Sequence, residues 1–576
     1  MVIMQVGERW WQWRDLVTIK QTSEPDEVVG LLAEVERAVM VEGLEAAGFI
    51  SYEAARGWGW PTHEGGEMPL MWFGLYRRRE AIERPVRLGG DRVVVGEWES
   101  GVGREAYEGA IREIKERIAA GETYQVNYTL PFRSEAQGEP WVWFQQVWWG
   151  SRPAYSAYIE TDEWAICSWS PELFFRVEGE RVVTKPMKGT VGRGVTVAED
   201  EKQRAWLVSS EKNRAENVMI VDMLRNDLGQ VARTGSVRVT ELFTTERYPT
   251  LWQMTSTVEA ETGVTLAALL AALFPCASIT GAPKRRTMAI IKGLEREARG
   301  VYTGGIGFMS GGGGEREAHF NVAIRTGVWR KVGVGRGVVR YDVGGGIVWD
   351  SEAAGEYEEA KLKGAIVGRA AAPFVLLEAV LWVPGYGFVL LAEHRARLLG
   401  SAEYFGYAVD WGVVMAGMEG AVRGKVWAQK VRVTVGVTGE VGVVAEGVGM
   451  GGPMRAAVAR EPIARENRFL YHKTSRREMY TAARAGRPGY DEVILWNELG
   501  EVTEGTTANV VVRRGGRWVT PPVECGLLAG TLRGWLLARG MIEEGVVRVD
   551  ELGDCEGVYL VNSVRGWREA EGIVGA

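Results

Sequence analysis

The sequence predicts an α+β protein that is too long for one domain. With 576 residues the chain is several times the usual single-domain length, so two large domains or three to four smaller ones are expected. Short apolar runs alternate with polar turns over residues 165–190, as in strands, and residues 214–232 then show helical periodicity. The regular βαβ alternation of a doubly wound sheet does not occur, which favours mixed α and β structure.

One domain boundary is predicted in the stretch GAIVGRAAAPF, residues 364–374. Helical periodicity is lost there, the stretch ends near a proline, and a new strand pattern begins at Val375. We therefore expect a first domain over residues 1–368, with an N-terminal part (1–100) and the informative segments in 100–365. The second domain is expected over residues 369–576.

Composition excludes several classes of protein. Hydrophobic residues make up 46% and charged residues 25%, enough apolar material for a core in each half. The net charge of −7 and the lack of a basic stripe argue against a nucleic-acid partner. The four cysteines form no C-x-x-C pair, and the longest apolar run, Leu266 to Phe274, is too short to span a bilayer. A cytoplasmic enzyme with no membrane contact is expected.

An acidic helix near residue 355 is the first candidate site. Four charged residues recur at helical spacing and fall on one face: Glu352, Glu356, Glu359 and Lys363. Alone, such a face is more often a solvated surface. The preceding Gly344-Gly345-Gly346 favours binding, because glycine N–H groups can approach an anion while the carboxylates hold Mg²⁺. Glu216, on another acidic helix, could complete the site, although spacing alone cannot bring the two helices together.

Seven segments in a fixed order give the first half a family resemblance. They are SPELFF, KPMKGT, RAENVMIVDMLRNDLG, ITGAPK, YTGGIG, NVAIRT and GGGIVWDSEAAGEYEEAKLK. Together they resemble the chorismate-utilising enzymes over roughly residues 100–365. The resemblance implies a two-lobed α+β chorismate-binding domain with large antiparallel sheets.

Lys188 of KPMKGT carries the prediction of the reaction. The resemblance implies lysine here in enzymes that make aminodeoxychorismate and alanine in those that make anthranilate. A neutral lysine amine can add to the chorismate ring at C2 before ammonia enters at C4. We expect Lys185, Arg193 and burial to lower the pKa of Lys188. Glu172 matches the general acid/base, and Gln253 stands where anthranilate-forming relatives have histidine, so the first site should stop at aminodeoxychorismate.

The resemblance also implies ligands for metal and substrate. Glu216 and Glu359 match Mg²⁺ ligands, with Glu356 as a third or outer carboxylate. Contacts to the two substrate carboxylates are implied for a further group: Thr190, Thr280, Tyr302, Arg325, Gly344, Gly346 and Lys363.

The second half resembles a different family through LLEA, EHRARLLGSAEYFG, HKTSRREMY, GEVTEGTTANVVV, TPP and LLAGTLRG, over about 375–576. These match the fold-type IV pyridoxal-phosphate enzymes, which implies two α/β subdomains, pyridoxal 5′-phosphate and a homodimer through this domain. Lys473 matches the Schiff-base lysine, Glu504 the partner of the pyridinium nitrogen, and Arg397 and Thr531 the phosphate ligands. Leu532 and Ala379 depart from the residues that are frequent in relatives.

The two halves together predict synthesis of 4-aminobenzoate from chorismate and ammonia. The first domain would make 4-amino-4-deoxychorismate and the second would eliminate pyruvate from it as a lyase. The alternatives are a second half that is a class IV amino-acid transaminase, or a non-catalytic scaffold. None of the cysteines sits in a glutaminase elbow, so ammonia is expected from a separate glutamine amidotransferase subunit.

Overall fold

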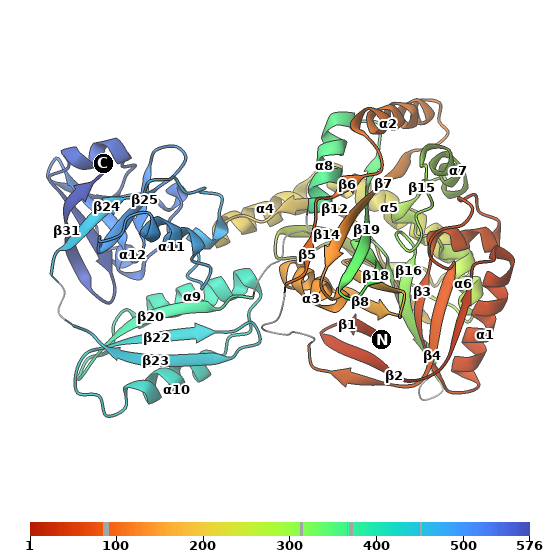
Figure 1. Ribbon diagram of the computed structural model, residues 1–576, viewed down its shortest axis with the longest axis horizontal. Coiled ribbons are helices and arrows are strands. Elements are labelled where there is room, and N and C mark those ends of the chain that lie inside the picture. The colour runs from red at the N-terminus through yellow and green to blue at the C-terminus, as the bar shows by residue number, and fades with distance from the viewer. Residues whose placement is uncertain (85–91, 312–314, 366, 368–372, 450–451, 576) are drawn as a thin grey trace. The chain divides into compact units, whose positions relative to one another are not determined.

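The computed structural model divides the chain into two compact units (Figure 1). It describes residues 1–84, 92–311, 315–365, 367, 373–449 and 452–575. The N-terminal unit comprises Met1–Gly192 and Arg204–Ala372, and the C-terminal unit comprises Pro373–Ala576 together with Arg193–Gln203. The boundary expected between residues 368 and 369 lies outside the described residues. No sequence pattern indicated that residues 193–203 pack with the second half.

The N-terminal unit is built on one large antiparallel sheet. Its strands follow one another through a continuous series of pairings in this order: β13 (Arg238–Arg247), β14 (Leu251–Glu261), β11 (Arg181–Lys185), β10 (Leu173–Glu178), β17 (Glu317–Val322), β16 (Gly305–Ser310), β3 (Glu45–Ile50), β4 (Met71–Ile82), β2 (Arg9–Thr22), β1 (Val2–Val6), β8 (Tyr155–Glu160), β9 (Trp164–Ser170), β18 (Thr326–Gly333), β19 (Arg336–Ile347) and β7 (Gln125–Gln137). Two short strands add to it: β12 (Met187–Gly192) continues β11 along β14, and β15 (Gly281–Ala282) pairs with β7. The expected large antiparallel sheet is thus confirmed.

Helices cover this sheet and close its cores (Figure 1). α1 (Val28–Met40) and α6 (Leu266–Leu273) contribute Val28, Leu32 and Leu270 to one core, together with the inner faces of β3 and β4. α2 (Arg104–Ala119) contributes to a second core, which contains Trp143 of α3 (Pro140–Ser151). The burial of such large apolar side chains supplies the main stabilisation of a sheet of this size.

Two further helices carry the predicted acidic residues. α5 (Glu211–Gly229) begins where the Ser210 side chain accepts a hydrogen bond from the Asn213 N–H, an N-cap. α8 (Ala353–Ala365) follows directly on β19 and lies beside it, so the glycines of β19 and the carboxylates of α8 belong to one region. The predicted helices at 214–232 and from about Glu352 are therefore present with slightly shifted ends.

The C-terminal unit contains two subdomains, each with its own sheet. The first pairs β21 (Gly387–Phe388), β20 (Leu376–Val383), β22 (Gln429–Val435) and β23 (Val441–Gly447), packed against α9 (Leu391–Phe405) and α10 (Trp411–Val422). The second sheet mixes parallel and antiparallel pairs of β26 (Val502–Gly505), β25 (Glu492–Trp496), β24 (Met454–Val458), β31 (Gly566–Val574), β30 (Gly557–Asn562), β27 (Asn509–Arg514), β28 (Arg517–Thr520) and β29 (Glu543–Glu544). α11 (Glu478–Ala485) and α12 (Thr531–Leu537) lie on this second sheet, which confirms the expected pair of α/β subdomains.

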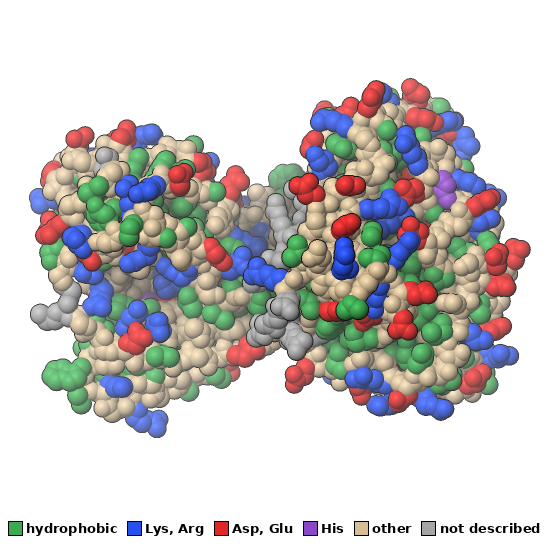
Figure 2. Space-filling model, viewed as in Figure 1, with side chains coloured by type: hydrophobic (Ala, Val, Ile, Leu, Met, Phe, Trp, Pro, Cys, Tyr) green, Lys and Arg blue, Asp and Glu red, His purple; other side chains and the backbone are tan. Residues whose placement is uncertain are grey.

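The surface agrees with the composition. On the face of the N-terminal unit seen in Figure 2, acidic and basic side chains are intermixed rather than gathered into a basic stripe. Of the helices in the described ranges, not one combines the length and apolar character needed to cross a membrane.

Candidate functional site

Residues from distant parts of the sheet's pairing series meet at Lys188. Lys188 lies on β12, which continues β11 along one edge of β14, whereas Gly346 lies on β19 and Gln125 on β7, two paired strands late in the series. A Cβ atom at Gly346 would lie 2.8 Å from Lys188 Nζ and 3.1 Å from Gln125 Nε2. A larger residue at this position would therefore displace the lysine amine. The main chain of Lys188 is held from α5, where Asn217 Nδ2 donates to its carbonyl at 3.3 Å.

Burial lowers the pKa of Lys188, and the neighbouring charges act in both directions. Desolvation is the largest cause, Glu216, Glu172 and Glu356 raise the pKa, and Lys363 lowers it. The cation that acts on Lys188 is thus not one of those expected from the sequence. Lys185 is ion-paired with Glu246, and Arg193 belongs to the C-terminal unit, where it pairs with Asp200. A lowered pKa increases the fraction of neutral amine, the form that acts as a nucleophile.

Glu172 is buried and interacts electrostatically with this lysine. The pKa of its carboxyl group suits proton transfer near neutral pH. Only 3% of the residue is exposed, and burial raises its pKa to about 7 against the opposing effects of Ser278, Lys188 and the Met187 main chain. Its Oε1 atom has no hydrogen-bond partner among the described residues. At pH 7 about half of the carboxyls carry a proton that can be given to a leaving group.

The predicted substrate contacts divide into two groups. Gly344, Gly346 and Lys363 lie together, since Lys363 Nζ donates to the Gly344 carbonyl at 3.0 Å. Thr190 Oγ1 donates to Gln253 Oε1 at 2.8 Å, and Gln253 Nε2 donates to the Gly189 carbonyl. Gln253 therefore fixes the turn that follows Lys188, a second role beyond replacing a histidine.

The other predicted contacts lie further from the lysine amine or are occupied. Thr280 is fully buried, and its hydroxyl donates to the carbonyls of Cys276 and Ala277. Arg325 has a left-handed backbone (φ 49°) and acts electrostatically on Tyr248 and Tyr341. Substrate contact by Thr280 and Arg325 stays a prediction.

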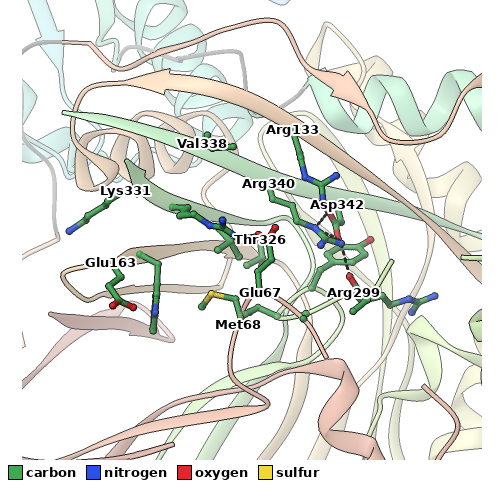
Figure 3. Close-up of a pocket in the computed structure, with 18 of the residues that line it drawn as sticks. Glu67, Met68, Arg133, Glu163, Arg299, Thr326, Lys331, Val338, Arg340 and Asp342 are labelled. Carbon is green, nitrogen blue, oxygen red and sulfur yellow. Dashed lines mark hydrogen bonds and ion pairs between the residues drawn. The ribbon is translucent and has the colours of Figure 1, made fainter. Parts of the chain in front are cut away.

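Tyr302 lines a separate cavity of about 660 Å³ that includes neither Lys188 nor Glu172. Figure 3 shows Arg133, Arg299, Arg340 and Asp342 at one side of this cavity and Lys331 and Glu163 at the other. Its cations are already paired: Arg340 with Asp342 at 2.7 Å, Arg299 with Glu295 at 2.7 Å, and Lys331 with Glu160 at 2.8 Å. This cavity therefore offers little free positive charge to an anionic substrate.

The three predicted metal ligands differ in their surroundings. Glu216 and Glu356 both act on Lys188, and Glu356 Oε2 would lie 3.0 Å from a Cβ at Gly345. Glu359 is instead ion-paired with Lys363 at 2.8 Å. Across the described ranges, His, Cys, Asp and Glu side chains form no group of three or more arranged to hold a metal. Mg²⁺ is commonly held by one or two carboxylates plus substrate oxygens and water, and all three carboxylates stay predicted ligands.

Gln125 was missed by sequence reasoning. It is 1% exposed, and neither Nε2 nor Oε1 has a hydrogen-bond partner among the described residues. An unsatisfied buried amide costs free energy and normally has a ligand or water as partner. Its position next to Gly346 and the Lys188 amine points to a bound molecule. The only signal in the sequence was a glutamine at the start of a strand, and such a residue does not by itself predict a binding site.

The second predicted site lines a cavity of about 890 Å³ in the C-terminal unit. Burial lowers the pKa of Lys473 to about 8, with Arg397 and Arg477 lowering it further and Glu378 and Glu504 opposing. Burial raises the pKa of Glu504 to about 7, and its Oε1 accepts hydrogen bonds from Tyr480 at 2.7 Å and from the Leu528 N–H at 3.2 Å. A lysine with an accessible neutral form and a fixed acid are thus placed in the same cavity.

The predicted phosphate ligands lie in that cavity with a buried carboxylate. Arg397 makes two hydrogen bonds to Glu378, at 2.8 and 2.7 Å, and His394 Nδ1 lies 2.7 Å from the same carboxylate. These partners hold the pKa of Glu378 at about 2 against its burial. Thr531, the first residue of α12, lies 3.3 Å from His394 Nε2 through its hydroxyl. The donors present, Arg397, Thr531, Lys473 and Glu504, fit pyridoxal phosphate, although Arg397 is shared with Glu378.

Each half of the chain matches a known protein family. The sequence model of chorismate binding enzymes matches residues 7–368, and that of amino-transferase class IV matches residues 375–573. Aminodeoxychorismate synthase component 1 of Klebsiella aerogenes is 41% identical over 264 residues, 46% of this chain and 57% of that protein. The Escherichia coli protein of the same name is 40% identical over 271 residues, 47% of this chain and 58% of its own length. The chain thus spans less than two thirds of these relatives.

A solved structure shows the same fold for the first half. Anthranilate synthase component I from Streptococcus pneumoniae superposes with a TM-score of 0.53 at 23% identity, covering 62% of this chain and 92% of that protein.

Proposed function

Since the chain belongs to the chorismate binding enzyme family, we propose that its N-terminal unit converts chorismate and ammonia to 4-amino-4-deoxychorismate. The observation that carries the proposal is the desolvated Lys188 amine, with lowered pKa, placed next to Gly346 of β19 and acted on by the protonatable Glu172. Alanine at this position would leave no nucleophile.

The reaction balances in two displacements. The neutral Lys188 amine forms a bond to ring C2, both conjugated ring double bonds shift by one position, and the C4 hydroxyl departs as water with the proton of Glu172. Ammonia then bonds to C4, both double bonds shift back, and the C2–nitrogen bond to Lys188 breaks. Glu216 and Glu359, with Glu356 as a third or outer carboxylate, are the residues that would hold Mg²⁺, which neutralises substrate carboxylate charge when bound.

Ammonia is supplied, in this proposal, by a separate glutamine amidotransferase subunit. Hydrolysis of glutamine needs a reactive thiolate. Burial instead raises the pKa of every cysteine in the chain, to about 12 for Cys276 and Cys525 and in the same direction for Cys167 and Cys555. None of them has the properties of a glutaminase nucleophile.

The C-terminal unit is proposed to be the lyase that releases pyruvate and 4-aminobenzoate. Pyridoxal phosphate, when bound, supplies the electron sink for such an elimination. Lys473 would attach the cofactor and take the proton from ring C4, and Glu504 would pair with the pyridinium nitrogen. Dimerisation through this unit also belongs to the proposal, as does a cytoplasmic location.

Two variants test the two halves separately. Lys188→Ala should lose aminodeoxychorismate formation at saturating ammonium and Mg²⁺, whereas Lys185→Ala, whose amine is paired with Glu246, should retain it. Unchanged synthesis in Lys188→Ala would exclude the covalent role. For the second half, borohydride reduction of the protein treated with pyridoxal phosphate should label Lys473. The absence of a label would favour a non-catalytic scaffold. Transamination that depends on an added amino acid would favour a class IV amino-acid transaminase.

A further inference from the structure

The cavity of the C-terminal unit holds more positive charge than its cofactor requires. Its lining carboxylates are Glu378 and Glu504, whereas its lining cations are Arg397, Lys430, Arg432, Lys473, Arg477, Arg565 and Arg568. On the face seen in Figure 2, Lys and Arg side chains gather across the middle of this unit. The phosphate of a cofactor would use part of this charge, and the remainder would attract an anionic substrate.

Arg477 is the best placed of the remaining cations. It lines the same cavity as Lys473 and Glu504, and its charge acts on both. One Nη atom donates to the Thr506 carbonyl at 2.6 Å, and the guanidinium carbon lies 4.4 Å from the centroid of the Tyr480 ring. The side chain is therefore held in place by the protein.

The guanidinium of Arg477 has no carboxylate partner in the part of the chain that the structure describes. Arg397, by comparison, is tied to Glu378, and Arg432 is paired with Glu446 at 2.9 Å. A half-buried guanidinium with free N–H donors suits a carboxylate, which it can bind through two parallel hydrogen bonds.

We propose that Arg477 binds a carboxylate of the substrate in the C-terminal site. The site would then select acids that carry a carboxylate far from the reacting carbon, in addition to the acidic group next to that carbon. The proposal rests on the proposed lyase function, because 4-amino-4-deoxychorismate is such a dicarboxylate. An apolar amino-acid substrate of a transaminase would leave the guanidinium desolvated and unpaired, which is unfavourable.

The first test uses purified 4-amino-4-deoxychorismate and measures pyruvate release. Arg477→Met retains the length of the side chain without charge, and we expect KM to rise about 10- to 100-fold, since a charge-assisted contact is lost. Arg477→Lys retains the charge but not the planar guanidinium, so its KM should lie between that of the parent and that of Arg477→Met. Arg476→Met is the matched control, because Arg476 is paired with Glu478 and does not line the cavity.

The second test does not depend on turnover. The cofactor absorption of the loaded protein is titrated with isophthalate and with benzoate, two probes that differ by one carboxylate. The parent should bind isophthalate at least tenfold more tightly, and Arg477→Met should lose this preference while retaining the borohydride label on Lys473.

The outcomes separate the two proposals. A parental KM and an unchanged preference for isophthalate in Arg477→Met would overturn the role of Arg477. Failure of the parent to release pyruvate from 4-amino-4-deoxychorismate would instead overturn the lyase function, and the isophthalate titration would still decide whether Arg477 binds a carboxylate.

Discussion

Replacing Gln125 by methionine should make the protein more stable and a worse synthase. The amide of Gln125 is buried with neither polar atom partnered among the described residues. Leaving a buried polar group unsatisfied costs about 1–3 kcal/mol, and methionine has a similar shape without the amide. The free energy of unfolding should therefore rise by about 1–3 kcal/mol, a gain of a few degrees in Tm for the N-terminal unit.

The same substitution should lower kcat/KM for aminodeoxychorismate formation. The amide lies beside Gly346 and the Lys188 amine, where a bound substrate would complete its hydrogen bonds. Loss of such a contact lowers kcat/KM by about 10- to 100-fold. Thermal unfolding without substrate and steady-state kinetics with saturating ammonium measure the two effects.

Gln145→Met is the matched control for Gln125→Met. Gln145 is a buried glutamine of α3 that interacts with other residues of the protein, so its replacement should lower Tm and leave kcat/KM unchanged. A parental kcat/KM in Gln125→Met would refute substrate contact. A lower Tm would refute the premise that the amide lacks a partner in the protein.

Three further predictions concern other groups. Glu172 must be protonated to release the C4 hydroxyl, so Glu172→Gln should lower kcat for aminodeoxychorismate formation by about 100-fold or more at pH 7, and a parental kcat would contradict its role as the acid. Glu216→Gln should raise the Mg²⁺ concentration needed for half-maximal synthesis at least tenfold and leave pyruvate release from 4-amino-4-deoxychorismate unchanged, and a parental Mg²⁺ titration would show that the ion is held elsewhere. Arg193→Met should destabilise the C-terminal unit by about 3–5 kcal/mol in thermal unfolding, because it removes the cation that neutralises the buried Asp200; a loss below about 1 kcal/mol would mean that the pair contributes little.

Sequence reasoning predicted the elements that follow a local pattern. The helix that bears Glu356 followed from spacing alone and is present, whereas the roles of Lys188 and Glu172, selected by the order of seven segments, stay predictions. The large antiparallel sheet and the paired α/β subdomains followed from the same resemblances and are confirmed.

The remaining features depend on contacts between residues distant in sequence. Gly346 and Lys188 are 158 positions apart in the printed numbering, and only the pairing of β19 and β12 with their neighbours brings them together. Proximity in sequence misled the expectation for Lys185 and Arg193, since Lys185 binds Glu246 and the chain carries Arg193 into the other unit. The buried amide of Gln125 has no pattern that a single sequence reveals.

The packing of residues 193–203 is the clearest case. Tyr404 donates its hydroxyl to the Gly194 carbonyl at 2.7 Å, and the Arg193 guanidinium lies 4.3 Å from the centroid of the Tyr404 ring. The Tyr404 ring in turn lies 4.2 Å from that of His472, the neighbour of Lys473. A segment directly after β12 thus supports the region of the second predicted lysine.

The most direct test of the account is to incubate the protein with chorismate, ammonium, Mg²⁺ and pyridoxal phosphate and to identify the products by mass spectrometry. The account predicts 4-aminobenzoate and pyruvate in equal amounts without an added amino donor, and accumulation of 4-amino-4-deoxychorismate in Lys473→Ala. Glutamine should replace ammonium only when a glutaminase subunit is added. Release of anthranilate by the parent, or 4-aminobenzoate from Lys473→Ala at the parental rate, would contradict it.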